Sequence, residues 1–147
     1  MMNLYLAGPF FDDEQIDRVE RVEKALNQNT TVDNFFSPRL STVDKSLEVG
    51  SDEWSKAVFK LDVDEIKKAD AVIAIIDFVD DNVDSGTAFE IGYAHAINKP
   101  VILFHEKSGN VNLMLSNGSN SYLTTIDDIV KFDFVKIPEY KYNGKVF

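Results

Sequence analysis

The chain has 147 residues, the usual size of one domain, and can bury roughly 68–70% of its unfolded surface without disulfides or metals. Its net charge of −10 argues against binding to a nucleic-acid backbone, which needs clustered Lys and Arg. The absence of cysteine excludes disulfides and thiolate metal sites and favours a reducing, cytoplasmic compartment.

The N-terminal residues Asn3–Ala7 are predicted to form a buried strand that ends at Gly8-Pro9. This apolar start is short, has no basic flank and is followed by no cleavage pattern, so a strand is favoured over a signal peptide. No segment approaches the ~20 apolar residues of a membrane helix, so no membrane partner is expected.

The next elements alternate between helix and strand. Asp12–Asn29 has apolar residues at helical spacing, and Val32–Ser37 is a second strand closed by Pro38. Leu40–Gly50 is expected to be a loop, and Asp52–Ala69 an amphipathic helix.

A continuous apolar run, Ala71–Ile76, is typical of a parallel strand covered on both faces. The acidic loop Asp77–Ser85 follows it. Gly86–Asn98 is a helix of mostly small and apolar residues, which we expect to be largely buried, and Val101–Phe104 is the next strand.

The last third has weaker signals. Ser108–Ser121 is polar, with an apolar interruption at Val111–Leu115. Tyr122–Thr124 is a candidate strand and Ile126–Phe132 a short helix, whereas Phe134–Phe147 shows no clear period.

The alternation predicts one α/β domain over residues 1–147, with a doubly wound, flavodoxin-like or Rossmann-like, mostly parallel sheet flanked by helices. Ligands bind beyond the carboxyl ends of the strands in such sheets. That rule selects the loops after Ala7, Phe36 and Ile76 as the candidate site.

Glu90 is the only carboxylate in the apolar helix that follows the third of these loops. Its neighbours on the helix face include no cation. The side chain therefore either lies on a solvent-exposed strip or faces a cavity, where desolvation raises its pKa.

Two more carboxylates and one tyrosine could serve the same site. Asp84 is an ordinary helix cap or a second carboxyl beside Glu90, and such a pair suits glycosidic cleavage. Asp62 is better explained by composition alone as part of a solvated helix face. Tyr5 is either a core tyrosine or a hydrogen-bond partner of Glu90.

The acidic run of four aspartates between Asp77 and Asp84 lacks calcium-loop spacing, so no metal is expected. No GxGxxG or GxxxxGK[ST] motif is present, so dinucleotide and P-loop sites have no anchor. No cofactor is predicted.

Five segments in order resemble the nucleoside 2-deoxyribosyltransferases, and they span nearly the whole chain. They are Tyr5-Leu-Ala-Gly-Pro-Phe-Phe11, the Asp62 segment, Ala69-Asp-Ala-Val-Ile-Ala-Ile75, Asp84-Ser-Gly-Thr-Ala-Phe-Glu-Ile-Gly-Tyr-Ala94 and Asn112-Leu-Met114. The block from Asp84 to Ala94 is the most specific.

The resemblance implies an enzyme that moves a 2-deoxyribosyl group between nucleobases, in nucleotide salvage, with Glu90 as nucleophile and Tyr5 as its hydrogen-bond partner. Asp84 and Asp62 would handle protons on the base and contacts to it. It also implies substrate contacts from residues of the first-strand, Asn112 and terminal segments, namely Gly8, Phe11, Asn112, Met114 and Phe147.

The implied partners are 2′-deoxynucleosides and free nucleobases. The resemblance also implies a homo-oligomer, a hexamer built from dimers, in which Asn112 reaches into a neighbouring subunit's site to bind the sugar 5′-hydroxyl. Residues 38–50 depart from the family because they lack the glutamine that some members place against the base. Ser37, Arg39 and Ser41 occupy that region instead, which leaves base selection open.

Two alternatives remain. A 2′-deoxynucleoside 5′-monophosphate N-glycosidase would need a phosphate site of Ser, Arg or helix-start amides. A nucleoside-sensing module would bind without turnover and form no ester on Glu90. Asn112 and the acidic surroundings favour an uncharged 5′-hydroxyl over a phosphate.

Overall fold

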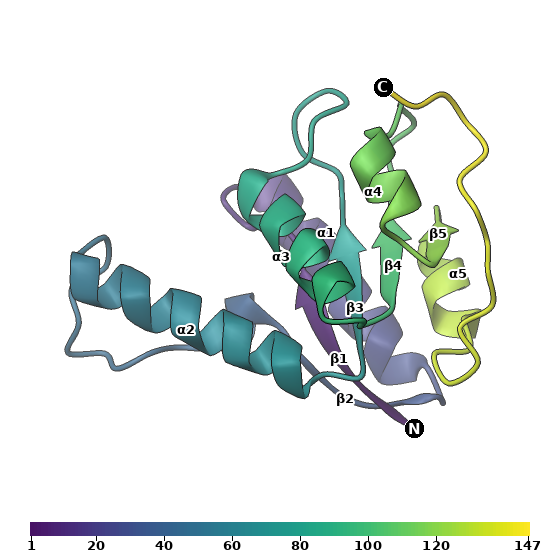
Figure 1. The fold of residues 1–147 in the computed structure, drawn as a ribbon. Helices are drawn as coiled ribbons and strands as arrows, with labels where there is room; N and C mark the ends of the chain where they lie inside the picture. The colour runs from purple at the N-terminus through teal and green to yellow at the C-terminus, as the bar shows by residue number, and fades with distance from the viewer.

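The computed structural model describes all 147 residues, and its centre is a five-stranded parallel sheet (Figure 1). The strands run in the order β2-β1-β3-β4-β5, and every neighbouring pair is parallel. Their bounds are β1 Met2–Ala7, β2 Val32–Phe36, β3 Ala71–Ile75, β4 Val101–Phe104 and β5 Ser121–Leu123. The predicted doubly wound α/β domain is thus confirmed, with a fully parallel sheet.

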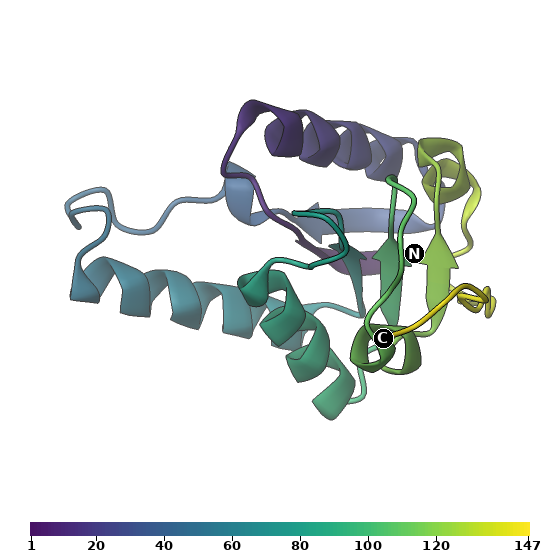
Figure 2. The same ribbon diagram turned by 90° about the horizontal axis from the view of Figure 1, so that it is seen from above.

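Helices cover both faces of this sheet, which gives the three layers seen in Figure 2. One face packs against α1 (Asp13–Gln28) and α5 (Ile126–Lys131). The other packs against α2 (Asp52–Lys68), α3 (Ser85–Ala96) and α4 (Leu113–Asn117). Alternation along the strands divides the core: Leu4 and Leu6 of β1 face α1, whereas Tyr5 and Ala7 face α2 and α3.

The strand order reverses between β1 and β3, since β2 lies on one side of β1 and β3 on the other. This switch point is where open parallel sheets bind ligands. A tight fit marks it in the structure, because a side-chain carbon added at Gly8 would lie 3.0 Å from Cβ of Ile75. Glycine at this position lets the loop after β1 lie against the end of β3.

The helix starts follow from capping side chains. Asp12 accepts a hydrogen bond from the amide of Gln15 at 2.9 Å, and Ser51 one from the amide of Trp54 at 3.2 Å. Asp84 caps α3 in the same way. None of the helices has the length and apolar character needed to cross a membrane.

The structure corrects one sequence expectation, the burial of the Gly86–Asn98 helix, and gives defined structure to three segments for which no helix or strand was predicted. Pro38–Leu40 forms a 3-10 turn that ends where the predicted loop begins, and α4 forms at the apolar interruption Val111–Leu115. The C-terminal tail, which has no clear period in the sequence, is joined to the domain because Val146 forms a parallel bridge with Val111. The helix α3 is buried on only one face, with Phe89 and Gly92 exposed, because no other element of the chain covers its outer side.

Candidate active site

Tyr5 and Glu90 come together at the switch point, although 85 residues separate them in sequence. The Tyr5 hydroxyl donates a hydrogen bond to Oε2 of Glu90. The Tyr5 ring is fully buried and stacks on Phe36 with 5.7 Å between ring centroids. A stacked ring cannot swing away, so Tyr5 fixes one oxygen of the Glu90 carboxylate and leaves the other for chemistry.

Burial raises the pKa of Glu90 to about 7, and the negative charges of Asp62 and Asp84 add to the rise. The hydrogen bond from Tyr5 acts in the opposite direction and lowers it. Burial, followed by the charge of Glu90, also raises the pKa of Tyr5, so its hydroxyl keeps its proton and remains a donor. Glu90 therefore exchanges between acid and carboxylate near neutral pH.

This raised pKa predicts that glutamine at position 90 stabilises the protein in alkaline solution. The folded state holds a proton on Glu90 that the unfolded chain releases near its usual value, so wild-type stability falls as pH rises from about 4.5 to about 7. Glu90→Gln should be more stable by about 2 kcal/mol at pH 8, or roughly 4–8 °C in Tm, with no gain at pH 4.5. Thermal unfolding at both pH values tests this; an equal gain at both would contradict it.

Removal of the Tyr5 hydroxyl should shift the pH dependence of any reaction that uses the Glu90 carboxylate. In Tyr5→Phe the ring still stacks, but Glu90 loses a hydrogen bond to its charged form, so its pKa rises further. The ascending limb of kcat/KM against pH should move up by about one unit, with a loss of about tenfold at pH 6. Tyr140→Phe, at an exposed tyrosine, is the matched control; an unmoved limb in Tyr5→Phe would refute the assigned contact.

Asp84 lies at the start of α3, six residues before Glu90. Its Oδ2 accepts hydrogen bonds from the amide and the hydroxyl of Thr87, at 3.1 and 3.2 Å. The cap interpretation is therefore correct. Asp84 is also close enough to Glu90 to affect its pKa, so capping and a role in proton transfer are compatible.

Asp62 does not lie on a solvated helix face. It is partly buried, and burial raises its pKa to about 6. It lines a cavity of about 420 Å³ together with Phe10, Arg39 and Trp54. Its charge influences both Tyr5 and Glu90, which makes this cavity the neighbour of the Tyr5–Glu90 pair.

No functional role was predicted for Phe10 or Trp54, which supply the aromatic surface of this cavity. One signal was available for Trp54. Four residues of α2 that line the cavity are spaced at intervals of four, three and one, which places them on one side of the helix; they are Trp54, Val58, Leu61 and Asp62.

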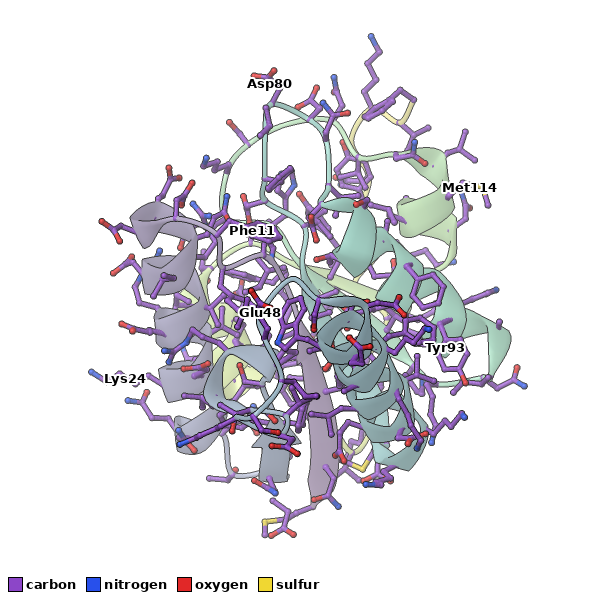
Figure 3. The ribbon with its side chains drawn as sticks, turned by 90° about the vertical axis from the view of Figure 1, so that its left-hand side faces the viewer. Phe11, Lys24, Glu48, Asp80, Tyr93 and Met114 are labelled. Carbon is purple, nitrogen blue, oxygen red and sulfur yellow. The ribbon has the colours of Figure 1, made fainter.

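Gly8 and Phe11 lie in the loop that joins β1 to α1. Phe11, labelled in Figure 3, is 74% exposed. Its ring meets Phe78 edge-on, and its amide donates to the side-chain oxygen of Gln15. Gly8 lies against Ile75. Both residues flank the switch point, and their contacts with substrate stay predictions.

Asn112, Met114 and Phe147 meet around a different cavity, of about 620 Å³, which Gly92 and His95 of α3 also line. Asn112 caps α4 by accepting from the amide of Met114 at 2.9 Å, and the carbonyl of Phe147 accepts from the amide of Leu113 at 2.9 Å. Glu90 does not line this cavity. Within one subunit, no hydrogen bond or aromatic contact joins these three residues to the Tyr5–Glu90 pair.

Two of the remaining aspartates of the acidic run, Asp77 and Asp81, hold loops in place. Asp77 is buried and accepts from the amides of Glu106 and Lys107, at 2.9 and 2.7 Å. Asp81 accepts from the amide and the side chain of Asn110. These bonds join the loop after β3 to the loop after β4, and so support the segment that leads into α3.

Comparison with known proteins gives a consistent result. Residues 4–126 match the family model described as nucleoside 2-deoxyribosyltransferase. A nucleoside deoxyribosyltransferase of Limosilactobacillus fermentum is 31% identical over 137 residues, which cover 84% of this chain and 80% of the relative. A nucleoside deoxyribosyltransferase of Lactobacillus leichmannii is 27% identical, and the match covers 98% of this chain and 97% of that relative.

Solved structures agree with the sequence match. A 2-deoxyribosyltransferase of Bacillus psychrosaccharolyticus superposes with a TM-score of 0.85 at 36% identity, covering 95% of this chain and 98% of that one. A CMP N-glycosidase of Clostridium botulinum shares the fold, with a TM-score of 0.56 at 23% identity. The match covers 84% of this chain and 89% of that one. The chain belongs to the nucleoside 2-deoxyribosyltransferase family of enzymes.

Proposed function

We infer that the protein transfers the 2-deoxyribosyl group of a 2′-deoxynucleoside to a second nucleobase through a covalent ester on Glu90. The observation that carries this proposal is the partly buried Glu90 carboxylate, held by the Tyr5 hydroxyl beside the carboxyls of Asp62 and Asp84. Family membership supplies the reaction class.

The first step forms a bond between Glu90 and the anomeric carbon C1′ of the donor. The bond from C1′ to the base nitrogen breaks, and its electron pair leaves with the base, which takes a proton from Asp84. The transition state has oxocarbenium character, and a sugar without a 2′-hydroxyl tolerates that positive charge better. By holding Oε2 of Glu90, Tyr5 keeps the other, attacking oxygen of the carboxylate aligned throughout.

In the second step a new base attacks C1′ on the opposite face and releases the Glu90 carboxylate. The incoming base gives up a proton, which returns to Asp84. Two inversions retain the configuration at C1′. The cavity beside Asp62, with the aromatic side chains of Phe10 and Trp54, is the proposed binding place for the base. A base bound against these aromatic side chains would displace water from the site, which favours transfer over hydrolysis.

The proposed assembly is a homo-oligomer, a hexamer built from dimers, in which each site is completed by a neighbouring subunit. Asn112 and Met114 gather at a cavity that Glu90 does not line, and Met114 is 71% exposed on α4 (Figure 3). In this assembly Asn112 binds the 5′-hydroxyl of a nucleoside in the neighbour's site.

An exchange assay with mass spectrometry tests the proposed function. The protein is mixed with deoxyadenosine, deoxyinosine, deoxycytidine or thymidine, with and without an acceptor base, and the products are separated by chromatography. We expect new deoxynucleosides only when the acceptor is present, and a mass increase of one deoxyribosyl group on the peptide containing Glu90. Release of free deoxyribose at the same rate without acceptor would indicate a hydrolase. Binding with neither product nor adduct would indicate a sensing module.

The monophosphate alternative is tested in the same assay with deoxyadenosine 5′-monophosphate. A site built for a 5′-hydroxyl should use deoxyadenosine at least tenfold better, since a phosphate would enter an acidic site without a counter-charge. A preference for the monophosphate would contradict the proposed substrate class.

A further inference from the structure

Arg39 is rigidly held at the cavity beside Asp62. It lies directly after β2, at the carboxyl end of the sheet, and lines the 420 Å³ cavity. Its Nε and Nη2 donate to the carboxylate of Glu23, at 3.2 and 2.6 Å. Glu23 is itself buried and accepts a hydrogen bond from the Ser37 hydroxyl at 2.7 Å. The guanidinium therefore has a fixed orientation before any ligand binds.

Part of the donor capacity of Arg39 remains for a ligand. A guanidinium carries five N–H groups and no acceptor. The Glu23 carboxylate accepts one hydrogen bond from Nε and one from Nη2. Nη1 forms an ion pair with Glu20 at the longer distance of 3.6 Å. The side chain is 24% exposed. One N–H on each terminal nitrogen can therefore donate to two neighbouring acceptors.

The charges around Arg39 favour a neutral acceptor over a phosphate. Glu20 and Glu23 already balance its positive charge. Within the cavity, Lys45 is offset by Asp44 and Asp62. A doubly charged phosphate would meet no net positive charge here, whereas a carbonyl oxygen of a flat base needs only an oriented donor.

We propose that Arg39 selects the nucleobase by donating to the O6 and N7 atoms of a 6-oxopurine, so that the enzyme prefers hypoxanthine and guanine over adenine. This inference rests on the proposed function in one respect, namely that the cavity beside Asp62 holds the base. The two N–H groups at the end of a guanidinium match the spacing of O6 and N7. Adenine presents an amino group in place of O6, which sets donor against donor and leaves an N–H of Arg39 unpaired.

Binding of free bases tests this selection without requiring catalysis. We expect calorimetry on the wild-type protein to give a lower Kd for hypoxanthine than for adenine. Arg39→Met keeps much of the aliphatic stem but removes every donor, and the ratio of the two Kd values should shrink by about 5- to 150-fold. The ratio of kcat/KM for deoxyinosine over deoxyadenosine, with one common acceptor, should fall by the same factor.

Two further variants separate selection from support of the fold. Lys56→Met removes an exposed cation of α2 that does not line the cavity and should leave the hypoxanthine-to-adenine ratio unchanged. Arg39→Lys keeps the charge but loses the paired donors, so it should lose most of the ratio while keeping the Tm close to that of the wild type. It therefore serves as the decisive variant if Arg39→Met does not fold.

An unchanged ratio in folded Arg39 variants would overturn the inference. An equal loss of affinity for adenine and hypoxanthine would do so as well, because it would make Arg39 a general support of the cavity. Loss of binding only for 5′-monophosphates would assign Arg39 to a phosphate. A wild-type protein that prefers hypoxanthine in calorimetry but exchanges no bases would instead refute the proposed function and leave the selection by Arg39 standing.

Discussion

Replacement of Glu90 by glutamine is expected to lower the rate of base exchange by at least about three orders of magnitude. An amide cannot form the ester, although it fills the same space and can still accept a hydrogen bond from Tyr5. Substrate binding should change little, so the loss should appear in kcat more than in KM. Steady-state exchange, together with intact-protein mass spectrometry, measures both the rate and the absence of an adduct.

Glu90→Asp sharpens this prediction. The shorter side chain keeps the carboxylate but withdraws it by more than 1 Å from the hydroxyl of Tyr5 and from C1′, and a displacement of that size costs on the order of 100-fold. The rate of base exchange should therefore be highest for the wild type, lower for Glu90→Asp and lowest for Glu90→Gln. Glu139→Gln, at an exposed glutamate, controls for the loss of a negative charge. A Glu90→Gln protein that folds and exchanges bases at the wild-type rate would refute the covalent mechanism.

Strongly patterned segments allowed the fold to be predicted from the sequence. All five residues of β3 are buried, and a continuous apolar run of this length predicts such a strand. The short α4 lacked any such signal. It spans five residues and is held by Asn112 and by the carbonyl of Phe147, which lies more than thirty residues further along the chain. A contact of that range leaves no trace in local periodicity.

In the candidate site, too, features set by the local sequence could be predicted, whereas those set by long-range contacts could not. The isolation of Glu90 in an apolar helix left two positions open, a solvent-exposed strip or a cavity, and in the structure the side chain is partly buried, with a pKa that burial raises. Composition alone placed Asp62 on a solvated helix face, which is wrong because residues of the 38–50 segment and of α2 enclose a cavity around it, whereas the family resemblance assigned Asp62 to the site. Arg39 could be named as a residue of that region, but its attachment to Glu23 depends on β2 lying beside α1, which only the folded chain reveals.

Two inactive variants should restore activity to each other when mixed. If Glu90 of one subunit works with Asn112 of its neighbour, Glu90→Ala and Asn112→Ala each damage every site in their own oligomers. A mixed dimer carries both defects in one site and none in the other. After subunit exchange of equal amounts, about one quarter of all sites should be intact. The rate of base exchange catalysed by the mixture should then rise well above the mean of the rates of the two parent variants.

Asn112→Ser is the matched control, because serine can still cap α4 while its side chain is too short to reach a neighbour. It should lose at least about tenfold in kcat/KM through the missing hydrogen bond, and it should complement Glu90→Ala as well as Asn112→Ala does. Native mass spectrometry verifies that mixed oligomers form. If they form and the rate stays at the mean of the parents, Asn112 acts within its own subunit. The separation of the two cavities by α3 would then have to be closed by movement of α4 and the C-terminal segment toward Glu90.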